Sequence, residues 1–123
     1  MVNLIVAGHG EFADGLRSSL SVIAGDFEHI SFLHFANDAE KLKADMLAVV
    51  DAKPNDSFLV LTDLVGGTPF KTAALLASEG KSLKVIGGAN LPMLLSIVYE
   101  TDSELASLAD TAVQAGKEGV KVF

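Results

Sequence analysis

The sequence contains no cysteine, only one tyrosine and only three prolines. The absence of cysteine excludes disulfides, thiolate chemistry and metal sites built on cysteine. No apolar run approaches the roughly 18 residues that a membrane-spanning helix needs. No basic segment or small-residue cleavage site precedes the first apolar stretch, as a secretion signal would require. Together these absences predict a cytoplasmic protein.

Basic residues are also few. The 123 residues include nine Lys and Arg against sixteen Asp and Glu, which gives a formal net charge of −7. Because the nine cations are scattered, nucleic acid would be repelled, and we expect no nucleic-acid partner. Half of the residues are hydrophobic and a fifth are charged, which is the composition of a globular chain. We therefore expect one domain over residues 1–123.

Five short segments have the pattern of β-strands. The run from Val2 to Ala7 is mostly apolar and is followed by glycine, which is typical of a strand buried on both faces. Similar runs cover residues 29–35, Ser57 to Thr62, and 84–86. Residues 119–123 alternate in polarity, which predicts a short C-terminal edge strand.

The segments between these strands have helical periodicity. Phe12, Leu16, Leu20 and Ile23 recur three or four residues apart, and Gly25 is well placed to end that helix.

A second helix is expected after residue 37. Asn37 and Glu40 have a spacing like that of a capping box, and Leu42, Met46 and Val49 would face inward.

Three more helices follow. Thr68 and Pro69 predict a helix start, with threonine as the N-cap and proline as the first helical residue. Another helix begins at Leu91-Pro92, and the last runs from about Asp102-Ser103 to about Gly116.

This alternation of strands and helices predicts an α/β fold with an open, mostly parallel sheet. Four strands would have helices on both faces, and the short C-terminal edge strand would be added to them. In such sheets ligands bind beyond the carboxyl ends of the strands, where the strand order reverses. That rule selects three loops, at residues 8–10, 63–68 and 87–90.

His9 is the candidate reactive group, because it lies between two glycines directly after the first strand. A lone histidine in a loop is most often a polar surface residue, but this loop falls where the fold places its site. An imidazole has a reference pKa of about 6.5 and can act as a nucleophile near neutral pH. Asp63 ends the third strand and could orient the ring through one nitrogen. The alternative, that Asp63 only caps its loop, is equally open from the sequence.

The segment Gly66-Gly67-Thr68 comes just before the Pro69 helix and is the candidate phosphate-binding loop. Glycines allow backbone N–H groups to face outward, and a helix N-terminus favours an anion. A plain tight turn is the alternative. The segment is not a Walker motif, because no Gly-Lys-[Ser/Thr] follows, and Gly8-His9-Gly10 lacks the third glycine of a dinucleotide fingerprint.

The two other histidines, His29 and His34, border the second strand away from these loops. Both are interpreted as structural or surface groups. Three histidines this dispersed have no metal-ligand spacing, so no metal site is expected.

Three motifs resemble those of a known family. Val-Ala-Gly-His-Gly follows the first strand, Thr-Asp-Leu-Val-Gly-Gly-Thr-Pro-Phe the third, and Gly-Gly-Ala-Asn-Leu-Pro-Met the fourth. In this order they resemble the mannose-type enzyme IIA domain of the bacterial phosphoenolpyruvate-dependent sugar phosphotransferase system. The resemblance covers essentially the whole chain, with threonine at position 68 in place of the more familiar serine.

This resemblance implies a phosphoryl carrier with His9 and Asp63 as catalytic residues and Gly66, Gly67 and Thr68 beside the phosphoryl group. It implies that HPr donates the phosphoryl group and that a IIB component accepts it. Contact with the membrane would be indirect, through the IIC and IID transporter. It also implies a homodimer in which residues 119–123 join the partner's sheet. Transfer between imidazoles needs only positioning and charge stabilisation, so no cofactor is expected.

Three alternatives remain open from the sequence. One is a phosphoryl donor for a dihydroxyacetone kinase, which the Gly-Gly-Thr-Pro-Phe stretch disfavours. Another is a regulatory carrier, in which phosphorylation of His9 controls a transcription factor or an enzyme. The third is a non-enzymatic module that binds a free phosphorylated metabolite at the same loops.

Overall fold

The computed structural model describes residues 1–123, which form four strands and five helices. Their order is β1 (Val2–His9), α1 (Phe12–Ile23), β2 (Ile30–Phe35), α2 (Ala39–Asp51), β3 (Ser57–Thr62), α3 (Thr68–Ser78), β4 (Leu83–Ile86), α4 (Leu91–Ile97) and α5 (Leu105–Glu118). The first four predicted strands are confirmed to within two residues at each end. No helix is both long enough and apolar enough to cross a membrane.

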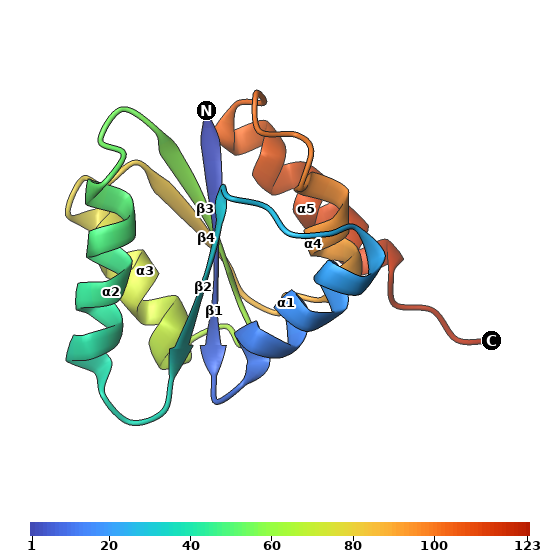
Figure 1. Cartoon of the computed structure of the whole chain (residues 1–123), viewed down its shortest axis with the longest axis horizontal. Helices are drawn as coiled ribbons and strands as arrows, with labels where there is room; N and C mark the ends of the chain where they lie inside the picture. The colour runs from blue at the N-terminus through green and yellow to red at the C-terminus, as the bar shows by residue number, and fades with distance from the viewer.

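The four strands form one parallel sheet in the order β2-β1-β3-β4. Helices α2 and α3 cover one face, and α1, α4 and α5 cover the other (Figure 1). This arrangement confirms the predicted α/β fold. From β1 the chain first moves outward to β2 and then returns to the opposite side of β1 for β3. The strand order therefore reverses between β1 and β3, and their carboxyl ends meet at one edge of the sheet.

The core has two layers, one on each face of the sheet. Successive residues of β1 alternate between the layers, because side chains along a strand point to opposite faces. Leu4 and Val6 pack on the side of α1, α4 and α5, whereas Ile5 and Ala7 pack on the side of α2 and α3. All four are buried, so the strand has no polar face toward water, which explains its mostly apolar sequence.

Two predicted helix starts are wrong by one residue. Asp38, rather than Asn37, is the N-cap of α2, and its side chain accepts a hydrogen bond of 3.0 Å from the Lys41 N–H. The chain offers two capping side chains in a row, and the second has the extended backbone that a cap requires. In α3 the N-cap is Gly67, and Thr68 is already helical.

The other helix predictions are confirmed with small differences. Gly25 adopts a φ of +99° after α1, as expected of a helix-ending glycine, but Ile23 is exposed. In α2, Leu42 and Met46 are buried as predicted, Val49 is half-buried against the core, and Val50 is also buried. Helix α5 begins at Leu105, later than the predicted start.

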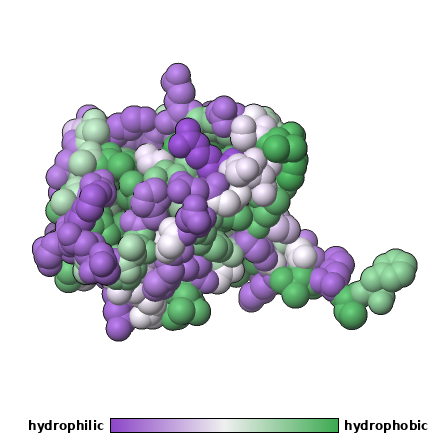
Figure 2. Space-filling view, turned by 60° about the horizontal axis from the view of Figure 1, so that its bottom comes forward, coloured by the Kyte–Doolittle hydropathy of each residue, from purple (hydrophilic) through white to green (hydrophobic).

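The predicted C-terminal strand does not form within this chain. Residues 120–123 have no regular structure after the cap of α5 at Gly119. Val120, Val122 and Phe123 are fully or largely exposed, and the segment projects from the body as a tail with apolar residues (Figures 1 and 2). A strand needs a neighbour for its N–H and C=O groups, and the tail meets no sheet edge of its own chain.

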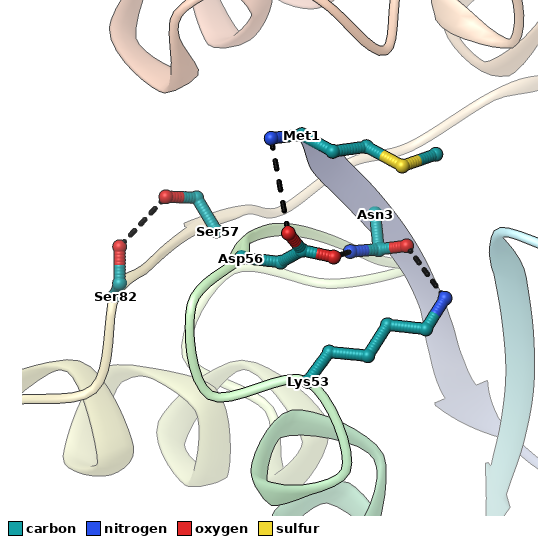
Figure 3. A network of polar contacts seen from close by, with 6 residues as sticks. All are labelled: Met1, Asn3, Lys53, Asp56, Ser57 and Ser82. Atoms are coloured by element: carbon teal, nitrogen blue, oxygen red, sulfur yellow. Dashed lines mark hydrogen bonds and ion pairs between the residues drawn. The ribbon is translucent and has the colours of Figure 1, made fainter.

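A polar network closes the amino end of the sheet (Figure 3). Asn3 is buried in β1, and its amide donates to Asp56 at 2.9 Å while its oxygen accepts from Lys53 at 3.1 Å. The Ser57 and Ser82 hydroxyls bond to each other at 2.8 Å. Because these groups satisfy one another, we interpret this end as structural.

A pair of glycine substitutions tests how closely α1 packs on β1. A Cβ atom at Gly8 would lie 2.6 Å from Phe12 Cδ2 and 2.9 Å from Phe12 Cβ, so α1 would have to move. A Cβ atom at Gly15, inside α1, would meet nothing within 4 Å. We expect Gly8→Ala to lower the free energy of unfolding by about 1–3 kcal/mol. Gly15→Ala should raise it by roughly 0.5–1 kcal/mol. Urea denaturation measures both, and a Gly8→Ala variant as stable as the parent would contradict the packing.

Candidate functional site

His9 and Asp63 meet where β1 and β3 end. The His9 Nδ1 atom lies 2.9 Å from Asp63 Oδ2, and the backbone N–H of His9 donates to the same oxygen at 2.9 Å. These hydrogen bonds place Asp63 against His9 rather than only within its own loop. A carboxylate only accepts hydrogen bonds, so Nδ1 carries a proton, and in the neutral form of the ring Nε2 then has the lone pair. The His9 side chain is 44% exposed, so the ring is open to a reaction partner.

The Asp63 carboxylate is mostly withdrawn from water, with 17% of its side chain exposed. Burial raises its pKa, but hydrogen bonds from the backbone and ring of His9, together with the ring's charge, outweigh burial and hold the pKa below its usual value. Its other oxygen, Oδ1, is buried and has no hydrogen-bond partner within the chain. The carboxylate therefore directs its charge at His9 through one oxygen.

The glycines beside His9 have different tasks. Gly10 adopts a φ of +56°, which lets the chain turn sharply toward α1, and its N–H donates to the Phe35 carbonyl at 2.8 Å. Gly8 instead leaves room for the Phe12 side chain. Position 8 therefore needs glycine for the packing of α1 on β1, rather than for access to the imidazole.

Gly67 lies directly against the imidazole. A Cβ atom at this position would be 2.8 Å from His9 Cε1 and 3.5 Å from His9 Nε2. The candidate phosphate-binding loop therefore meets the edge of the ring that carries Cε1 and Nε2. Gly66, the residue before it, has a φ of +80°, which shapes the turn from Asp63 into α3.

The N-terminus of α3 has free hydrogen-bond donors beside this contact. The backbone N–H groups of Thr68 and Phe70 have no hydrogen-bond partner within the chain, and neither has the Thr68 hydroxyl. A helix N-terminus also carries a partial positive charge. This end of α3 can therefore receive an anion close to His9.

The third predicted loop, residues 87–90, supports the site rather than entering it. A Cβ atom at Gly87 would lie 2.5 Å from Val65 Cγ2, so this loop packs closely on the loop after β3. The Ala89 N–H donates to the Thr62 carbonyl at 2.9 Å. The Asn90 side chain caps α4 through the Met93 N–H at 3.0 Å.

Phe35 is a member of the site that the sequence analysis did not single out. It ends β2, and its ring meets the His9 ring edge to face, with centroids 5.7 Å apart. The other two histidines lie elsewhere. His34 pairs with Asp14 at 3.3 Å on an exposed surface, and the ring of His29 packs against Phe27.

The lowered pKa of Asp63 gives a test of the His9 contact. Carbon-13 NMR titration of the Asp63 carboxyl should give a pKa below the usual value of about 3.9, and this pKa should rise in His9→Ala, where the ring contacts are lost but burial remains. A carboxylate with a lowered pKa stabilises the fold above its unfolded pKa, and this stabilisation is lost as the pH falls through the folded pKa. An Asp63 pKa that is equal in both proteins would rule out the contact.

Comparison with known proteins identifies relatives among the components of phosphotransferase systems. The chain is 30% identical over 129 aligned positions to the PTS system mannose-specific EIIAB component of Escherichia coli (strain K12), covering 99% of this chain and 39% of that protein. It is 30% identical over 101 positions to the PTS system fructose-specific EIIA component of Bacillus subtilis (strain 168), covering 80% of this chain and 69% of the relative.

Solved structures agree. The phosphotransferase system component EIIA from Streptococcus agalactiae superposes with a TM-score of 0.91 at 34% identity, covering 100% of this chain and 98% of that one. The mannose/sorbose specific IIA subunit from Enterococcus faecalis superposes with a TM-score of 0.89 at 26% identity, covering 98% and 93%. A sequence model of the EIIA-man family, described as "PTS system fructose IIA component", matches residues 3–113. This chain belongs to the EIIA-man family of phosphotransferase system components.

Proposed function

We propose that this chain is a phosphoryl carrier of a mannose-family sugar phosphotransferase system and that His9 carries the phosphoryl group. The observation that carries the proposal is the hydrogen bond from His9 Nδ1 to Asp63, which makes Nε2 the nitrogen with the lone pair in the neutral ring, beside the free N–H groups of α3. Family membership supports the same function.

In the proposed step, Nε2 attacks the phosphorus atom of a phosphohistidine on the donor protein. A bond forms between Nε2 and phosphorus as the bond from phosphorus to the donor nitrogen breaks, and the donor nitrogen keeps that electron pair. His9 then carries the phosphoryl group on Nε2 and the proton on Nδ1, so its ring is cationic. Asp63 stabilises that cation through the 2.9 Å contact. The reverse steps pass the group to the acceptor.

The phosphoryl oxygens would lie at the start of α3. Thr68 and Phe70 offer backbone N–H groups, and the Thr68 hydroxyl adds a third donor. Gly66 and Gly67 contribute by bringing these donors to the ring, since Gly66 makes the turn and Gly67 permits the close approach. Positioning and charge stabilisation then suffice for transfer, and the proposed step uses no cofactor.

The proposed partners are HPr as the donor and a IIB component as the acceptor, with the IIC and IID transporter reached only through IIB. Both partners must reach the same histidine and then leave it, which favours small, transient interfaces. Leu64 and Val65 support this use of the surface, because they are 59% and 69% exposed in the loop directly after Asp63. These side chains offer apolar contact to a partner centred on His9.

Intact-protein mass spectrometry tests the carrier function. The protein is incubated with phosphoenolpyruvate, enzyme I and HPr, and we expect it to gain one acid-labile phosphoryl group. His9→Ala should gain none, because the accepting nitrogen is absent. His34→Ala is the matched control and should be labelled like the parent, since His34 lies on an exposed surface and pairs with Asp14.

No labelling of the folded parent would refute the carrier function, and equal labelling of His9→Ala would refute His9 as the residue that carries the group. Saturable binding of a phosphorylated metabolite to a parent that is never labelled would instead support the binding module. Transfer from labelled protein to a IIB component distinguishes transport from a regulatory function.

We further propose that the protein forms a homodimer through its C-terminal residues. The tail at residues 120–123 has Val120, Val122 and Phe123 exposed, and the edge strand β4 has only four residues. An exposed tail of alternating residues and an open sheet edge suit one another across two chains.

Deletion of residues 120–123 should therefore convert a dimer to a monomer, because the strand that joins the two sheets is removed. Light scattering coupled to size-exclusion chromatography gives the mass of each species. A Lys121→Ala variant keeps the apolar residues of the tail and should remain dimeric. An unchanged mass after the deletion would contradict this mode of association.

A further inference from the structure

We propose that Phe35 and Gly67 are positioning residues for the reaction, and that with Asp63 they hold the His9 ring in one orientation. This inference rests on the proposed function, because it concerns how the same imidazole presents Nε2. The three residues come from the ends of β2, α3 and β3, and each contacts a different part of the ring.

One hydrogen bond at Nδ1 does not fix an imidazole. It fixes the position of that nitrogen, but the ring can still rock about the bond and move Nε2 sideways. The His9 side chain is 44% exposed, so solvent offers no resistance to such motion. A misplacement of about 1 Å can slow an enzymatic step on the order of 100-fold, so a carrier that aligns nitrogen and phosphorus needs further contacts.

Phe35 supplies one such contact. It is the register partner of His9 in the parallel pairing of β1 with β2, so both side chains leave the sheet on the same face. The two rings cross at 84°, with centroids 5.7 Å apart, which is a favourable edge-to-face arrangement. The Phe35 carbonyl also accepts from the Gly10 N–H at 2.8 Å. Phe35 therefore restrains both the ring of His9 and the backbone that follows it.

Gly67 supplies the other contact. Its φ of −73° and ψ of 168° are values that any residue adopts, so the backbone does not require glycine here. The ring does, because a Cβ atom would lie 2.8 Å from His9 Cε1. A side chain at position 67 would push the imidazole away from α3 and strain its bond to Asp63. The absence of a side chain thus sets where Nε2 stands relative to the free N–H groups of Thr68 and Phe70.

The first test replaces Phe35 by Ala, Leu and Tyr in the full chain, and it uses two readouts. Nitrogen-15 NMR of His9 reports which ring nitrogen carries the proton, without any phosphoryl donor. Rapid-quench transfer from phospho-HPr gives the rate at saturating donor and the half-saturating concentration separately. Phe35→Ala should lower the saturating rate about tenfold or more and reduce the population protonated on Nδ1, with little change in half-saturation. For Phe35→Leu, both the saturating rate and the population protonated on Nδ1 should lie between those of Phe35→Ala and the parent.

Tyrosine and a neighbouring phenylalanine provide the controls. Phe35→Tyr keeps the aromatic ring, so its transfer rate and its His9 nitrogen spectrum should be those of the parent. Phe32→Ala removes an aromatic side chain from the same strand, but Phe32 packs against the opposite core layer and beneath Arg17. It should leave the His9 nitrogen signals and the transfer rate unchanged. A merely structural role for Phe35 would make these two alanine variants alike.

Gly67→Ala tests the second contact. We expect this variant to lose the Nδ1-protonated form and most of its transfer, while Gly15→Ala, whose Cβ atom meets open space, changes neither. The proposal is overturned if Phe35→Ala and Gly67→Ala keep the parental His9 spectrum, whatever their transfer rates. If the parent itself accepts no phosphoryl group, the proposed function fails, but the nitrogen spectra still decide whether these residues hold the ring.

Discussion

The pairing of β1 with β3 is the constraint on which the rest of the site depends. The two strands are adjacent only because the chain reverses direction across the sheet after β2, and their register aligns Val2 with Ser57 through Ala7 with Thr62. That register brings the end of β1 beside the end of β3, so His9 and Asp63 meet although 54 positions separate them. A slip of one residue would turn either side chain to the other face of the sheet. The apolar residues that alternate between the two core layers prevent such a slip, so core packing fixes the geometry of the site.

Several parts of this arrangement follow from sequence pattern. The apolar runs, the glycines after strands and the helical spacing of Phe12, Leu16 and Leu20 have local physical causes, and the structure agrees with them. The placement of His9 and Asp63 at one edge follows from the parallel topology, because strand ends of a parallel sheet gather there. The local elements depend on periodicity, and the placement of the two residues depends on the order of the elements. Both can be recognised in a single sequence.

Other parts were missed because they depend on contacts between distant segments. Phe35 reads as one more apolar residue of a strand, and only the register of β1 with β2 places its ring on His9. Gly67 was predicted as part of the phosphate-binding loop, but its close contact with the imidazole was not predicted. The choice of Asp38 over Asn37 as a cap depends on a backbone angle that both residues tolerate. The C-terminal strand was predicted from alternation, which cannot say whether a pairing edge is within reach.

The polar groups at the two ends of the sheet differ in whether they have hydrogen-bond partners within the chain, and this difference bears on function. At the amino end, Asn3, Asp56 and Lys53 pair with one another (Figure 3). At the carboxyl end, the N–H groups at the start of α3 and the Nε2 atom of His9 have no hydrogen-bond partner within the chain.

Polar groups without hydrogen-bond partners do not help to stabilise a fold, because polar groups in stable folds are normally paired or solvated. They are suited to a protein that holds an anion briefly. Under the proposed function, the donors favour the phosphoryl group while it is bound, and the exposed His9 ring lets a partner take the group away. A more enclosed site would bind the phosphoryl group more tightly and release it more slowly. Under the proposed function, exposure of the His9 ring is therefore a requirement of transfer, and the proposed role of Asp63, Phe35 and Gly67 is to hold the exposed ring in one orientation.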